Sequence, residues 1–174
     1  MESFFFHPKV VHIPIALALL MPLVAAGVWV GWLRRWWPAR TWVIALALQG
    51  ALVASGVVAM QSGERDEELV ESIVPEPALE AHEEAAAQFV WAGGVVALAM
   101  VGALALANHP AGRVAAAVGV LGTLVVLALG YRTGQAGGAL VYKHGAASAF
   151  TAAGGTGAGL GGARAGNDEQ EERD

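Results

Sequence analysis

Four long apolar runs, separated by short polar stretches, dominate the pattern of hydrophobic and polar positions along this chain. The runs cover residues 10–33, 41–61, 85–107 and 114–130, which is 17 to 24 residues each. About 20 residues of helix, rising 1.5 Å per residue, cross the hydrocarbon core of a bilayer. Inside lipid only helices and closed barrels satisfy every backbone group, and these runs do not alternate as barrel strands do. The pattern predicts an all-α membrane protein, a bundle of four transmembrane helices.

Proline and glycine set the expected ends of these helices. We expect helices at about 10–33, 41–61, 78–107 and 113–131. The third should begin near Pro77, because proline is favourable in the first turn of a helix. The fourth should end at Tyr131, because the three glycines at positions 134, 137 and 138 follow it. Residues 1–150 then form one transmembrane domain, and the glycine-rich and acidic residues 151–174 form a flexible tail.

Composition supports the membrane assignment. Hydrophobic residues make up 56% of the chain and charged residues only 14%, whereas soluble domains carry roughly a quarter charged residues. The start, "MESFFFHPK", lacks the basic segment of a cleaved signal peptide, and the first apolar run is too long for a signal core. The chain has no cysteine, which excludes disulfides, covalently attached c-type haem and cysteine-ligated iron–sulfur clusters.

The charges predict which way the bundle sits. The short loops "RRWWPAR" and "NHPAGR" contain four arginines and no acid, whereas all fifteen acidic residues fall on the opposite face. The excess of basic residues in short loops places the arginine face in the cytoplasm. Both termini and the 62–84 loop are then periplasmic, as in a bacterial inner-membrane protein. The net charge of −5 argues against nucleic acid as a partner.

Four of the five histidines fall on the predicted outer face. They are His7, His12, His82 and His144, and His109 alone lies on the inner face. An unpartnered ring inside an apolar helix is costly, and spacing places His82 on the inward face of its helix. We expect His12, His82 and His144 to meet at the outer end as ligands of a cofactor or a metal ion, with His7 as a further candidate. The alternative is that these rings bind backbone carbonyls or lipid headgroups.

Several neighbours could support such a site. Glu80, Glu83 and Glu84 flank His82, and a carboxylate can fix one imidazole nitrogen and leave the other free to bind a ligand. They are equally typical of a solvated helix start. Tyr142 could pack against a bound ring. Gln49, in the middle of the second run, is expected to form an interhelical hydrogen bond.

The chain also resembles a known family. The segments "HPKVVHIPIALALL", "SGVVAMQSGERDE", "LEAHEEAA" and "GGALVYKHG" are similar to those of a bacterial family of predicted four-helix membrane proteins of unknown function. Members are sometimes linked to cytochrome c or Rieske modules. The resemblance spans about residues 7–148. It implies that His7, His12, His82 and His144 stand at signature positions, and that a redox setting is to be expected.

Three functions remain open at this point. The leading expectation is non-covalent b-type haem held between two imidazoles, one of them from His82, for electron transfer with a periplasmic cytochrome or within a larger membrane complex. The second is a non-haem transition-metal site. The third is a non-catalytic subunit of a respiratory or photosynthetic complex. No nucleophile and base are paired by the sequence, so no enzymatic activity is assigned, and the oligomeric state stays open.

Overall fold

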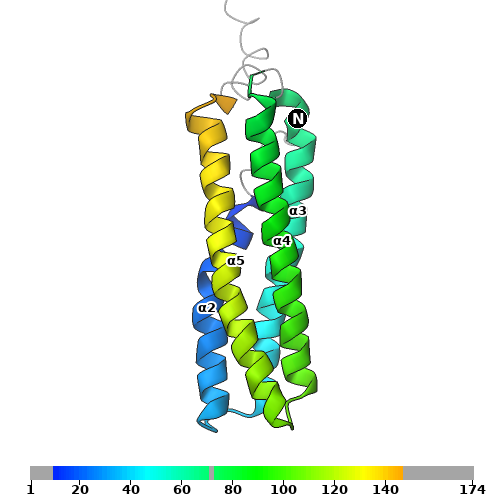
Figure 1. The fold of residues 1–174 in the computed structure, drawn as a ribbon, viewed down its shortest axis with the longest axis vertical. Helices are drawn as coiled ribbons and strands as arrows, with labels where there is room; N and C mark the ends of the chain where they lie inside the picture. The colour runs from blue at the N-terminus through cyan, green and yellow to red at the C-terminus, as the bar shows by residue number, and fades with distance from the viewer. Residues whose placement is uncertain (1–9, 71–72, 147–174) are drawn as a thin grey trace, which may run out of the picture.

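The computed structural model describes residues 10–70 and 73–146, which form an upright bundle of four long helices (Figure 1). In chain order the elements are α2 (His12–Leu33), the short 3₁₀ helix η2 (Ala39–Thr41), α3 (Trp42–Val70), α4 (Glu76–Ala105) and α5 (Pro110–Tyr142). Each of the four long helices is long and apolar enough to cross a membrane. No strand occurs in the described part of the chain, so the predicted all-α, four-span fold class is confirmed.

The helices form a square in which sequence neighbours touch. The most extensive packing is between α4 and α5, and α2 packs against both α3 and α5, while α3 also packs against α4. Consequently α2 and α4 stand diagonally opposite each other. Because α2 has 22 residues and the other three have 29 to 33, those three continue past α2 at one end (Figure 1).

The two ends of the bundle have different chemistry. We call residues 33–42 and 105–113 the arginine end, after the side chains of Arg34, Arg35, Arg40 and Arg113. We call residues 64–84 and 131–146 the histidine end, which holds His82 and His144. The first turn of α2 lies at the border of the histidine end, and beyond it α3, α4 and α5 are the helices that the described residues form.

A core of small and large apolar residues runs along the bundle axis. The largest fully buried side chains are Trp42, Met21, Leu52, Met100 and Val126, together with the polar Gln49 and Thr123. Large hydrophobic residues on the outside stay exposed, for example Leu23 at 73% and Leu98 at 72%. In water such exposure would be costly, whereas in lipid these side chains lie in their preferred solvent. This distribution is the one expected of a bundle that spans a bilayer.

The expected end of the fourth helix was wrong. Instead of stopping at Tyr131, α5 continues for another eleven residues to Tyr142, through all three glycines that were expected to break it. Likewise α3 continues past residue 61 to Val70. Glycine lowers helix stability by about 1 kcal/mol relative to alanine, but at Gly137 the missing side chain lets His82 of α4 pack against α5. The start of α4 agrees with the prediction that it begins near Pro77. Pro75 is its N-cap, and Pro77 lies in its first turn.

Candidate functional site

The imidazole of His82 lies against the backbone of α5 at Gly137. A methyl group added at Gly137 would stand 3.1 Å from Cε1 of His82 and 3.5 Å from its Nδ1. With any side chain larger than that of glycine, the ring would have to move away by a few tenths of an ångström. The ring is half-buried, and Nδ1 itself has almost no accessible surface. The expectation that His82 faces inward agrees with this placement.

The same packing recurs along the seam between α4 and α5. Met100 lies against Gly119, Val96 against Gly122 and Phe89 against Gly130. Each is a large side chain of α4 that fills the space left by a missing side chain on α5. His82 takes the next position of this kind toward the histidine end. An imidazole there occupies a position that apolar side chains hold elsewhere.

Polar contacts fix the seam just beside His82. The hydroxyl Oγ1 of Thr133 lies 3.0 Å from the carbonyl oxygen of Ala85, one turn along α4 from His82, and 3.0 Å from the carbonyl oxygen of Leu129 in its own helix. Arg132 Nη1 donates to Oε1 of Gln88 at 3.4 Å. These bonds tie α5 to α4 across the helix pair and hold the register in which Gly137 meets His82. The sequence alone did not single out Thr133 or Gly137. Their four-residue spacing, which puts both on one face of α5, is the signal that could have found them.

Burial distinguishes two histidines from every other charged or titratable group described. Among the ionisable side chains whose burial the structure describes, only His82 and His144 are partly buried, and all the others are exposed. Exposed groups at a membrane surface are solvated and need no special partner. Partly buried imidazoles retain lone pairs that can bind a proton, a metal ion or a haem iron.

His12 lies at about the same level as His82. Ala18, Phe89 and Gly130 form one layer, because a methyl group at Gly130 would be 3.1 Å from Phe89 and 3.7 Å from Ala18. His12 stands six residues beyond this layer and His82 seven, which is about 9 Å and about 10 Å along the helices. The side chain of His12 is exposed, about 120° around α2 from Ala18. The two histidines therefore share a level but not a face.

His144 is placed further toward the histidine end. It follows the last turn of α5, where its N–H donates to the carbonyl of Ala139 at 3.2 Å, about 10 Å beyond Gly137. A small apolar cluster lies at the same end and consists of Val70, Val74, Ala146, Ala78, Leu79 and Leu140. Among the described residues, no three His, Cys, Asp or Glu side chains gather around a common point. His7 lies outside the described residues.

The neighbours expected to assist His82 are on the outside of the bundle. Glu80, Glu83 and Glu84 are all exposed, and Oε1 of Glu84 accepts a hydrogen bond from Gln88 Nε2 at 3.1 Å. Tyr142 is 90% exposed. These placements fit a solvated helix start and an interfacial tyrosine.

Gln49 makes the interhelical hydrogen bond expected of it. Its Nε2 donates to the carbonyl of Gly93 at 3.0 Å, and one heptad away Trp42 Nε1 donates to the carbonyl of Met100 at 3.1 Å. Both bonds run from α3 to α4 in the membrane-spanning part. The amide of Gln49 is fully buried, and its Oε1 finds no donor among the described residues.

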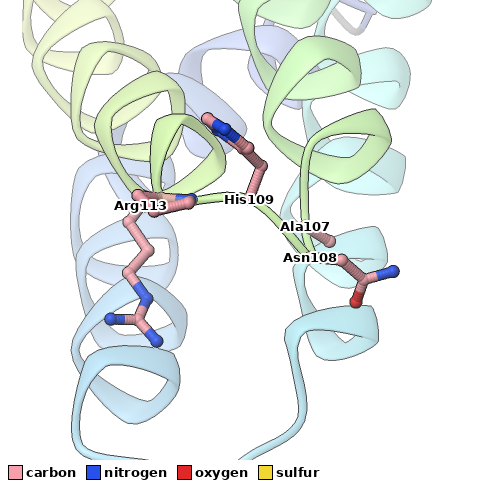
Figure 2. Close-up of a pocket in the computed structure, with 5 residues that line it drawn as sticks. Ala107, Asn108, His109 and Arg113 are labelled. Atoms are coloured by element: carbon pink, nitrogen blue, oxygen red, sulfur yellow. The ribbon is translucent and has the colours of Figure 1, made fainter.

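A shallow recess of about 200 Å³ opens at the arginine end, in the turn between α4 and α5. Ala107, Asn108, His109, Pro110 and Arg113 line it, and the labelled polar side chains point in different directions (Figure 2). The His109 ring turns back over α5, where its Nδ1 accepts the N–H of Ala111 at 3.1 Å and so caps the helix. These side chains do not converge as the residues of a catalytic site would.

Four apolar helices with a lipid-facing outside define the class: this is an integral membrane protein built as a four-helix bundle. The chain belongs to the family described as "Predicted membrane protein (DUF2231)", whose model matches residues 4–149. The family membership expected from the sequence segments is thereby confirmed. Searches of curated proteins and of solved structures found no significant match.

Proposed function

We propose that this protein binds b-type haem at the histidine end of its bundle and transfers electrons there, with His82 as one axial ligand. The observation that carries the proposal is the position of His82. Its half-buried imidazole occupies a core-facing position of α4, where Met100, Val96 and Phe89 stand at the other levels of the same seam. A ring nitrogen of a partly buried imidazole can bind haem iron.

The surroundings of His82 suit a flat ligand. Methyl groups at Gly134 or Gly138 of α5 would meet no atom within 4 Å, so there is open space beside α5 at these two positions next to Gly137. In addition α2 begins at this level, so among the described residues no helix continues beyond it at the position diagonally opposite α4. Imidazole donors, small residues and the absence of cysteine fit non-covalent haem.

The second axial imidazole would come from one of two places. His7 and His12 belong to the chain that enters α2 at the level of His82, and five residues of extended chain reach at most about 18 Å. His144 is partly buried and follows the last turn of α5, two residues before Ala146 of the apolar cluster. A haem bound between two imidazoles would supply one-electron redox chemistry without an open coordination position. The protein's own part is to hold His82 in place through the Gly137 contact and the Thr133 bond.

We further propose that the histidine end faces the periplasm of a bacterial inner membrane. The support is the excess of arginine in the short loops of the other end. Electron exchange would then involve a periplasmic cytochrome or a neighbouring subunit of a larger membrane complex.

The test is the absorption spectrum of the protein purified from haem-replete cells, oxidised and then reduced with dithionite. We expect a Soret band with sharpened α and β bands on reduction. Comparing His7→Ala, His12→Ala and His144→Ala then identifies the second ligand as the variant whose reduced spectrum loses its six-coordinate form.

A colourless preparation that contains a transition metal by elemental analysis would overturn haem in favour of a non-haem metal site. A preparation with neither would leave the protein as a non-catalytic membrane subunit.

A further inference from the structure

The arginine end carries four positive charges and no carboxylate among the residues described. Arg34, Arg35, Arg40 and Arg113 are all exposed. The sequence has no acidic residue between Glu2 and Glu64, nor between Glu84 and Asp168, so the described helices and loops of this end offer no internal counter-ion. Guanidinium groups clustered in this way attract an external anion.

The four arginines stand at the level of a membrane surface. Each lies within about one turn of a helix end, next to tryptophans that are typical of the boundary between lipid and water. Trp36 and Trp37 are 68% and 47% exposed, and the guanidinium of Arg34 lies 5.8 Å from the centre of the Trp36 ring. Phospholipid phosphates occupy the same level in a bilayer.

Two contacts set the positions of these arginines. Trp29 Nε1 of α2 donates to the carbonyl of Arg113 at 3.1 Å, which fixes the first turn of α5 beside α2. The Arg113 side chain lines the recess and points in the opposite direction to the His109 ring (Figure 2). In the loop after α2, the ring of Trp37 covers Gly31. Arg35 in that loop has a φ of 58°, a conformation that usually favours glycine.

We propose that the arginine end is a binding surface for the phosphate headgroups of anionic phospholipids in the surrounding leaflet. A guanidinium can bind phosphate oxygens through two parallel hydrogen bonds. Exposed tryptophan rings beside it lie against the acyl chains and glycerol region of the same lipid. Basic surfaces between transmembrane helices bind anionic headgroups through this combination of charge and shape. The proposal is independent of haem, which concerns the opposite end.

Native mass spectrometry of the purified full-length chain in a mild detergent tests it. Phosphatidylglycerol and phosphatidylcholine with identical acyl chains are titrated separately, and the apparent Kd of each is measured. We expect phosphatidylglycerol to bind at least fivefold more tightly than phosphatidylcholine. Arg113→Gln should weaken the binding of phosphatidylglycerol about fivefold, because each basic residue near an anionic lipid changes the Kd by about that amount. Arg113→Lys, which keeps the charge, should retain most of the affinity.

Arg132→Gln is the matched control, because Arg132 is an exposed arginine of the same helix at the histidine end and its removal should leave the Kd unchanged. An unfolding temperature close to that of the native chain in phosphatidylcholine shows that each variant is folded. Equal affinity for the two lipids would overturn the proposal, as would equal loss in Arg132→Gln. Competition by inorganic phosphate at concentrations near the lipid Kd would also overturn it, since the surface would then bind a free anion.

Discussion

Gly137 and Gly138 are neighbours in α5, yet a methyl group added at each would meet different surroundings. At Gly137 it would stand 3.1 Å from Cε1 of His82, whereas at Gly138 it would meet nothing within 4 Å. Helix propensity alone favours alanine over glycine by about 1 kcal/mol at both positions. The difference between the two variants therefore isolates the contact with the imidazole.

We predict that Gly137→Ala is less stable than Gly138→Ala by about 1 kcal/mol, because the ring must move to admit the methyl group. Thermal unfolding in detergent, followed by circular dichroism, measures the difference. Equal unfolding temperatures would mean that His82 does not lie against α5.

Gln49 provides a second test at the scale of one residue. Gln49→Leu should change the free energy of unfolding by less than about 1 kcal/mol, because interhelical hydrogen bonds in membranes average about 0.6 kcal/mol and leucine fills a similar volume. Gln49→Ala should cost about 2 kcal/mol or more, because it leaves a cavity between α3 and α4. A loss in Gln49→Leu as large as that in Gln49→Ala would show that the amide does more than join two helices.

At the scale of single residues, the sequence predicts those side-chain positions that depend on helical spacing. The inward direction of His82 and the hydrogen bond of Gln49 follow from their positions in apolar helices. The contact between His82 and Gly137 does not, because it depends on the register between two helices, which no local pattern gives. The expected meeting of His12, His82 and His144 stays a prediction, since the ligand set depends also on His7 and on the bound group.

At the scale of elements, helix ends followed the sequence where the apolar run has sharp borders. The predicted range 10–33 agrees closely with α2 (His12–Leu33), because arginines follow it directly. The end of α5 was missed because a glycine next to a water-exposed turn and a glycine packed under a neighbouring helix look alike in sequence. What decides between them is the side chain that α4 presents at each level.

The turn between α4 and α5 contains a glycine that tolerates no side chain. A methyl group on Gly112 would collide with the carbonyl oxygen of Leu106 in the backbone of the preceding turn. We predict that Gly112→Ala lowers the free energy of unfolding by 1–3 kcal/mol, the usual cost of overpacking. Gly27→Ala is the control, since a methyl group there meets nothing within 4 Å. If both variants unfold at the same temperature, the tight approach of α5 to α4 at this turn is absent.

At the scale of the whole molecule, the two ends of the bundle divide the charges between them. Because each long helix is long enough to cross the membrane, the arginine end and the histidine end lie on opposite sides of it. Because the chain has no cysteine, a single introduced thiol reports the side on which it lies without background.

We predict that Glu83→Cys reacts with a membrane-impermeant maleimide in cells whose inner membrane is intact, whereas Asn108→Cys reacts only after that membrane is permeabilised. Both positions are exposed, so a difference in labelling reports the side of the membrane. The reverse labelling pattern would place the arginine end outside and contradict the proposed orientation.

The central claim is that His82 is a ligand and not a packing residue that happens to be polar. The most direct measurement is the ratio of haem to polypeptide in purified His82→Ala, compared with the native chain and with His109→Ala, in which the lost histidine caps α5 at the opposite end. We predict a ratio near one for the native chain and for His109→Ala, and a ratio near zero for a folded His82→Ala. Haem retained in His82→Ala at the native ratio would contradict the claim.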